Sequence, residues 1–209
     1  CLENANEGYD WVVDMDLERF FDTVNHSKLI QVLSDKVKDG RVVSLIHRFL
    51  RAGVVVNGMY QKTEEGCPQG GNLSPILANI LLNECDHELE LRGHRFVRYA
   101  DDMVISCASR KGAERTLEST ARYLENVLKL KVNREKTCIS RIGGIKFLGY
   151  GFYLDTKAKK WNFRLHEKSE AKLKAKVKEI TQRSNGWSVA YRQAKLSQLV
   201  RGWVAYFKL

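Results

Sequence analysis

Residues 96–106 read FVRYADDMVIS, in which two mostly apolar runs flank an acidic pair. Short apolar runs of this kind are typical of strands, so we predict strands at Phe96–Tyr99 and Met103–Ser106, joined by a tight hairpin. Asp101 and Asp102 then lie at the hairpin tip. Paired aspartates are also common in ordinary turns, so this segment alone leaves a purely structural interpretation open.

A third carboxylate follows another apolar strand near the start of the chain. Residues 11–16 (WVVDMD) indicate a short buried strand that ends at Asp16. If this strand neighbours the hairpin strands in one sheet, three carboxylates converge at one edge. Phosphoryl transfer needs metal ions held by hard oxygen ligands, which carboxylates supply. Asp14 and Asp22 are alternatives to Asp16, and spacing alone does not choose among them.

The charge of the chain is unevenly distributed. The 209 residues include 35 Lys+Arg and 25 Asp+Glu, a net charge of +10. Residues 157–209 carry 14 Lys/Arg and 3 Asp/Glu, a net of +11, whereas residues 1–156 are nearly neutral. Such a basic region indicates nucleic acid as the leading partner and an anionic membrane surface as the second. No apolar run approaches the roughly 18 residues of a membrane span, so a membrane protein is not expected.

Periodicity and turn residues predict the remaining elements. Helices are expected over 27–37, 42–50, 111–128 and 167–182, and around Leu196–Phe207. A further helix is expected from Ser74-Pro75 onward, with a buried face formed by Ile76, Leu77, Ile80, Leu81 and Leu82. Ser27 and Ser74 are expected to cap their helices. Short strands are expected at 54–56, 59–62, 131–133, 139–141, 145–153 and 160–163, with Asn57-Gly58 as a type I′ turn. This order indicates an α+β domain followed by a helical one.

Five blocks of residues, in order, resemble those of reverse transcriptases. Tyr99-Ala100-Asp101-Asp102 is similar to the YxDD box, and residues 16–22 (DLERFFD) are similar to the earlier aspartate block. Residues 66–79 (GCPQGGNLSPILAN), 133–137 (NREKT) and 147–150 (FLGY) are similar to the GxPQGxxxSPxLxN, NxxKT and FLGY blocks. The long Ser-Pro helix and residues 199–207 (LVRGWVAYF) resemble group II intron-encoded reverse transcriptase/maturases in particular.

The resemblance implies a fold and a division of the chain. Residues 1–163 would form a reverse-transcriptase-like palm, an antiparallel sheet with packed helices, together with part of the fingers. Residues 164–209 would form a basic helical thumb and the start of a maturase region. The family's amino-terminal fingers blocks should precede Asp16 by a longer stretch than is present, so we expect a fragment with little polymerase activity alone.

The resemblance also implies a two-metal nucleotidyl-transfer site. Asp16, Asp101 and Asp102 match the catalytic aspartates, which would coordinate two Mg²⁺, whereas Asp14 falls outside the aligned position. One ion would activate the primer 3′-OH and the other would neutralise the leaving pyrophosphate. The residues expected to contact the incoming nucleotide are Phe21 as a gate against the 2′-OH, Gln69, Ala100 beside the new base pair, and Lys136 near the phosphates. For the neighbouring Phe20, core packing is the preferred interpretation.

Two further sets of residues would hold the template–primer duplex. The FLGY block would form a primer grip, although core packing competes for its first two residues; its members are Phe147, Leu148, Gly149 and Tyr150. Lysines of the helix over 167–182 would contact phosphates without sequence preference; they are Lys168, Lys172, Lys174, Lys176 and Lys178. A solvated helix face is the simpler interpretation of any single lysine, but it does not explain the whole basic cluster.

Together these expectations describe an RNA-directed DNA polymerase of a mobile group II intron that also assists intron splicing. Its partners would be an intron RNA template, a DNA primer and dNTPs, with no membrane. Two alternatives stay open: an RNA-binding splicing factor with a vestigial polymerase, and a reverse transcriptase of another retroelement lineage. Five cysteines without a CxxC pair indicate reduced thiols in a cytoplasmic protein. The resemblance implies a bacterial or organellar-type host and association with nucleic acid.

Overall fold

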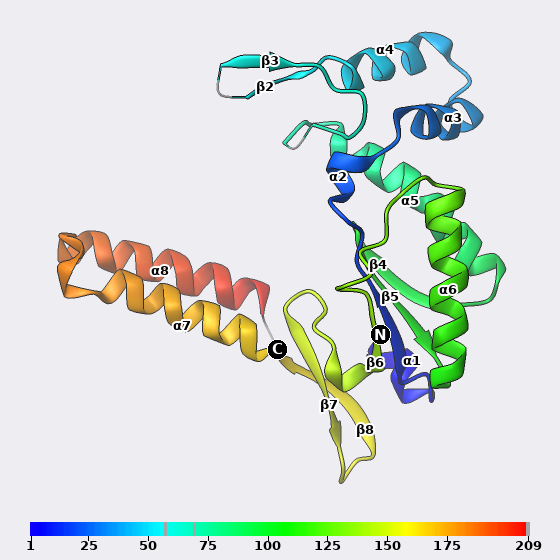
Figure 1. Ribbon diagram of the computed structural model, residues 1–209. Coiled ribbons are helices and arrows are strands. Elements are labelled where there is room, and N and C mark those ends of the chain that lie inside the picture. Colours follow the sequence, from blue (N-terminus) through cyan, green and yellow to red (C-terminus); the bar gives the residue numbers. More distant parts are fainter. Residues whose placement is uncertain (57, 69, 208–209) are drawn as a thin grey trace. The chain divides into compact units, whose positions relative to one another are not determined.

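The computed structural model describes residues 1–56, 58–68 and 70–207 (Figure 1). Helices and antiparallel strands alternate along the chain, which confirms the predicted α+β class. Within these ranges, no helix has both the length and the apolar character that crossing a bilayer requires.

The chain divides into two compact units, residues 3–141 and 142–209. Each unit has its own strands and helices. The functional limits predicted from the resemblance, 1–163 and 164–209, stay a prediction.

A four-stranded antiparallel sheet forms the centre of the first unit (Figure 1). Its strands stand in the order β4 (Arg95–Tyr99), β5 (Asp102–Cys107), β1 (Trp11–Met15) and β6 (Cys138–Arg141). Val13 pairs with Ile105 on one side and with Ile139 on the other. Side chains alternate between the faces of a strand, so Val13 and Met15 point into the core while Asp14 lies on the opposite face.

Helices α5 (Ser74–Leu91) and α6 (Arg110–Asn126) complete this core. α6 packs on β1, β5 and β6, while α5 contacts β4 and α6. Both helices contribute side chains that are almost fully buried: Leu77, Leu81, Leu82, Cys85, Leu89, Ala113, Ala121 and Leu124. On the opposite sheet face, Asn4 of the short α1 (Leu2–Asn6) hydrogen-bonds to Ser106 at 3.3 Å.

The chain between β1 and α5 forms the rest of the first unit. Its elements are α2 (Phe20–Thr23), α3 (His26–Lys36), α4 (Gly40–Leu50), β2 (Val54–Val56) and β3 (Met59–Gln61). α3 contacts both α4 and α5, and Leu29, Val32 and Leu33 extend the core. β2 and β3 pair as the predicted hairpin, whose Asn57 lies outside the described residues.

Several local predictions were wrong. Asn25, not Ser27, caps α3, because its side chain accepts the N–H of the third helical residue. Ser74 is already helical, and its hydroxyl donates to the carbonyl of Pro68 at 2.7 Å instead of capping α5. Ile76, predicted on the buried face of that helix, is 57% exposed. The predicted strand over 131–133 is a single bridge, formed by Val132 and Leu17.

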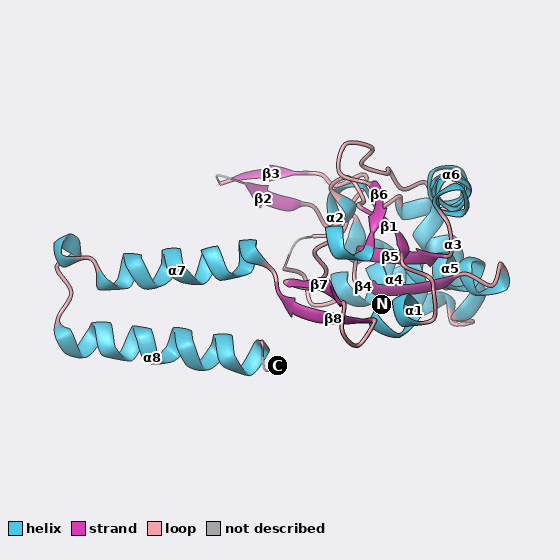
Figure 2. Ribbon diagram, turned by 90° about the horizontal axis from the view of Figure 1, so that it is seen from below, coloured by secondary structure: helices cyan, strands magenta, loops and turns pink. Residues whose placement is uncertain are grey.

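The second unit is a strand hairpin followed by a helical hairpin (Figure 2). After a 3₁₀ turn at Ile142–Gly144, its elements are β7 (Tyr150–Asp155), β8 (Lys160–Leu165), α7 (Glu167–Thr181), a second 3₁₀ turn at Arg183–Asn185, and α8 (Val189–Tyr206). α7 and α8 lie side by side in opposite directions, as Figure 2 shows. The predicted strand over 145–153 was wrong at its start, since β7 begins only at Tyr150.

Candidate active site

Antiparallel pairing brings the predicted carboxylates to one end of the main sheet. Asp16 follows the last residue of β1, and Asp102 is the first residue of the neighbouring β5. Asp101 lies in the two-residue turn between β4 and β5, next to Ala100, whose φ of +55° is left-handed. The sheet therefore gathers at one edge the three aspartates that the sequence singled out.

Asp14 lies on the same side of β1 as Asp16 and contributes to the same negative region. Its burial, together with the charges of Asp102 and Asp16, raises its pKa to about 6. Carboxylate oxygens are the donors that a hard divalent cation prefers. Nevertheless, in the part of the chain that the structure describes, no three His, Cys, Asp or Glu side chains are grouped so that they could hold a metal ion.

The loop after Val132 fixes the main chain of Asp16. The N–H of Asp16 donates to the hydroxyl of Thr137 at 3.1 Å, and the N–H of Asn133 donates to the carbonyl of Asp16 at 2.9 Å. The side chain of Asn133 also accepts the N–H groups of Glu135 and Lys136, which closes a tight turn. As a result, the Lys136 ammonium lies 3.7 Å from a carboxylate oxygen of Asp16. Because this lysine is 69% exposed, the ion pair itself contributes little stability.

Arg98 holds the turn that carries Asp101. Its guanidinium makes a bidentate ion pair with Asp86 of α5, and the two side chains are only 11% and 17% exposed. The same guanidinium donates to Asn79 at 3.0 Å and to the carbonyl of Ala100 at 2.9 Å. A left-handed alanine costs about 1–2 kcal/mol, and this anchored hydrogen bond offsets part of that cost.

A cavity of about 620 Å³ lies beside the loop that precedes α5. Its lining residues are Phe21, Gly70, Gly71, Asn72, Ser74 and Pro75. The volume falls within the range of small-molecule pockets. Phe20 is only 3% exposed and meets the Phe21 ring edge-on, which confirms its core role. Gln69, predicted to contact the nucleotide, lies outside the described residues.

In the second unit, residues 147–150 form a tight turn rather than a strand. Leu148 and Gly149 have φ values of +50° and +88°, both left-handed. The left-handed φ of Gly149 favours glycine, and a Cβ there would also lie 2.8 Å from a ring carbon of Phe207. The hydroxyl of Tyr206 donates to the carbonyl of Leu148 at 3.1 Å, so the end of α8 holds the turn.

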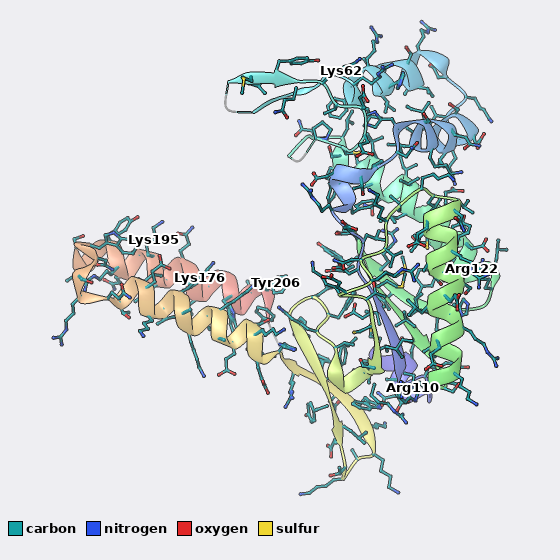
Figure 3. The ribbon with its side chains drawn as sticks, viewed as in Figure 1. Lys62, Arg110, Arg122, Lys176, Lys195 and Tyr206 are labelled. Atoms are coloured by element: carbon teal, nitrogen blue, oxygen red, sulfur yellow. The ribbon has the colours of Figure 1, made fainter. Side chains whose placement is uncertain are left out.

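The five predicted lysines of α7 are all exposed. Leu173, Val177 and Ile180 occupy the more buried face of the helix, as their spacing predicted. Figure 3 shows Lys176 on α7 and Lys195 on α8. Lys172 and Lys176, together with Lys146, line a cavity of about 310 Å³ whose other walls are largely apolar. The helical hairpin therefore presents lysines beside an apolar surface.

Comparison with known proteins identifies related sequences for both units. The family described as "Reverse transcriptase (RNA-dependent DNA polymerase)" matches residues 2–152, and "Group II intron, maturase-specific domain" matches residues 171–209. Protein YkfC of Escherichia coli is 32% identical over 175 residues, covering 67% of this chain and 46% of YkfC. The group II intron-encoded protein LtrA of Lactococcus lactis is 29% identical over 208 residues, covering 68% of this chain and 35% of LtrA. The chain thus spans less than half the length of these relatives.

The fold also resembles that of a solved structure. Apo telomerase from Candida tropicalis superposes with a TM-score of 0.59 and 14% identity, covering 76% of this chain and 33% of the telomerase chain. At this level of identity the likeness concerns the fold alone. It agrees with the predicted antiparallel sheet with packed helices.

Proposed function

Because this chain belongs to the reverse transcriptase family, we propose that the whole protein is an RNA-directed DNA polymerase of a mobile group II intron. The maturase-specific segment at residues 171–209 leads us to add assistance in splicing the intron RNA. The observation that carries the proposal is the position of Asp16, Asp101 and Asp102 at one edge of the sheet.

Reverse transcriptases use Mg²⁺, and we propose that two ions bind these three aspartates, whose side chains, among the described residues, do not form a closed ligand group in this structure. When bound, such ions activate the primer hydroxyl and neutralise the leaving pyrophosphate. The chain's own contribution is to fix the main chain that carries these aspartates. Thr137 fixes the main chain of Asp16, and Arg98 fixes the turn that carries Asp101.

The incoming dNTP would occupy the cavity beside Phe21. Phe21 forms one wall, where a 2′-OH would meet its ring, and residues 70–75 form the other. Ala100 presents only a methyl group at the tip of the hairpin and leaves space for the new base pair. Lys136, on its flexible and exposed stem, would bind the phosphates once the metal ions neutralise Asp16.

The second unit would hold the RNA template and the DNA primer. The turn over residues 147–150 would support the primer strand, held in shape by Tyr206. The lysines of α7 would contact phosphates: Lys168, Lys172, Lys174, Lys176 and Lys178. Binding of these lysines to phosphates releases condensed counterions into solution. Added salt reduces the free energy gained from that release, so the affinity for nucleic acid would fall steeply as ionic strength rises.

Primer extension by the whole protein tests the proposal. The reaction contains an RNA template, a DNA primer, dNTPs and Mg²⁺, and compares Asp101→Ala with Asp35→Ala. Asp35 is an exposed aspartate of α3 and serves as the matched control. We expect Asp101→Ala to abolish extension and Asp35→Ala to leave it unchanged. Extension by Asp101→Ala at the wild-type rate would show that the acidic edge is not the catalytic site.

A further inference from the structure

The two walls of the cavity beside Phe21 come from segments that are far apart in sequence. Phe21 belongs to α2, whereas the opposite wall is formed by residues 70–75. The intervening chain passes through two helices and a strand hairpin before it returns. The width of the cavity therefore depends on how the returning chain is fastened to the α2 segment.

Main-chain hydrogen bonds make this connection, here called the Gly66 seam. The N–H of Gly66 donates to the carbonyl of Val24 at 2.8 Å, and the N–H of Cys67 donates to the carbonyl of Phe21 at 2.6 Å. Gly66 has a φ of +86°, and a Cβ there would lie 2.8 Å from the carbonyl oxygen of Asp22. The two segments that carry the cavity walls are thus in direct main-chain contact.

His26 adds a side-chain contact to this seam. It is the first residue of α3, is 6% exposed, and its Nε2 lies 2.7 Å from the carbonyl oxygen of Gly66. A carbonyl oxygen only accepts, so Nε2 carries the proton and donates. Both the N–H and the carbonyl of Gly66 are therefore held by residues 24–26.

We propose that His26 is a positioning residue for the nucleotide pocket, an inference that rests on the proposed polymerase function. By holding Gly66, it fixes the distance between the Phe21 wall and the wall formed by residues 70–75. Loss of this hydrogen bond lets the walls separate, which weakens dNTP binding and discrimination against the 2′-OH. Binding of the template–primer is unaffected, because the residues assigned to it lie in the second unit.

Two substitutions in the whole protein separate positioning from folding. His26→Leu replaces the donor with an apolar side chain that still fills the buried site, whereas His26→Gln places an amide N–H near the position of Nε2. Steady-state primer extension gives the KM for dNTP and the KM for template–primer. We expect His26→Leu to raise the dNTP KM about tenfold, the equivalent of one hydrogen bond, with template–primer KM unchanged. His26→Gln should stay within about twofold of the wild type.

Three results would overturn the proposal. They are an unchanged dNTP KM in His26→Leu, a parallel rise of both KM values, and failure of His26→Gln to restore the dNTP KM. Absence of dNTP incorporation by the wild-type protein would instead count against the polymerase function.

Hydrogen exchange followed by mass spectrometry gives a readout that needs no activity. Peptides covering residues 64–68 should exchange faster in His26→Leu and at the wild-type rate in His26→Gln. Unchanged exchange in His26→Leu would refute the role of His26 whether or not the protein polymerises.

Discussion

Replacing Gly66 by alanine tests whether the main-chain contact at the Gly66 seam limits the stability of the first unit. Gly66 has a φ of +86°, and a residue with a Cβ adopts such a conformation at a cost of about 1–2 kcal/mol. Alanine also lowers the conformational entropy of the unfolded chain, which stabilises the folded state by about 0.4–1 kcal/mol. The conformational effect alone is therefore about 1 kcal/mol.

The surroundings of Gly66 make the expected loss larger. The added Cβ would lie 2.8 Å from the carbonyl oxygen of Asp22 and 2.9 Å from that of Phe21, both main-chain atoms. Relieving these contacts moves the chains apart and stretches the hydrogen bonds to Val24, Phe21 and His26. Losing two of these bonds adds about 2 kcal/mol, so Gly66→Ala should lower the free energy of unfolding by about 3 kcal/mol.

Gly93→Ala is the matched control. Gly93 has a φ of +71°, but a Cβ there meets nothing within 4 Å, so only the conformational cost of about 1 kcal/mol applies. Native-state hydrogen exchange in β1 and β5 measures the stability of the first unit without interference from the second. Equal destabilisation by Gly66→Ala and Gly93→Ala would refute the steric reasoning.

Three further predictions concern other parts of the chain. Thr137→Val should slow primer extension about tenfold while Thr137→Ser keeps the rate, because the hydroxyl accepts the N–H of Asp16; single-turnover extension measures both. Burial and neighbouring lysines lower the pKa of His166, whose Nδ1 accepts the N–H of Lys168 and caps α7. As the pH falls through about 6.5, this histidine therefore takes up a proton in the unfolded chain before it does so in the folded one. Stability of the second unit should therefore fall as pH drops through this range, and urea unfolding of His166→Asn should lose that pH dependence. Iodoacetamide at pH 8 should modify the exposed Cys138 in the native protein but Cys85 only after unfolding, because Cys85 is buried and its pKa is raised to about 12. Peptide mass spectrometry measures the modification of each cysteine.

The main strands and helices were predictable because local patterns determine them. The strand over 11–16 and the hairpin over 96–106 are short apolar runs bounded by acidic residues, and both appear in the sheet with nearly the predicted bounds. Antiparallel pairing then follows for the hairpin from its two-residue turn. The sequence did not predict that β1 pairs with β5; the convergence of the three aspartates only assumed it. In the structure the two strands do pair, with Met15 opposite Met103.

Local patterns failed where the conformation of a single residue decides the structure. Leu73 occupies the N-cap position with helix-like φ and ψ, and Ser74 is the first helical residue, so Ser74 cannot serve as a cap even though Ser-Pro usually begins a helix. Leu148 is left-handed at +50°, which nothing in a Phe-Leu-Gly-Tyr sequence indicates for leucine. This turn, rather than any change in apolar pattern, delays the start of β7.

The residues that position the site were missed because their partners are distant in sequence. Thr137 contacts Asp16 across 121 positions, and His26 contacts Gly66 across 40. Of these three positioning residues, Arg98 alone stands out in the sequence, because it is a charged residue within the apolar run FVRY. Its partner Asp86 lies on another element, so only the tertiary structure assigns it a role.

Incorporation of a single dNTP opposite an RNA template by the whole protein tests the central claim most directly. The measurement compares Mg²⁺ with excess chelator and scores splicing of the intron RNA in parallel. We predict that incorporation occurs with Mg²⁺ and stops when the metal ions are removed. Splicing assistance without any dNTP incorporation at any Mg²⁺ concentration would contradict the polymerase assignment and identify a splicing factor instead.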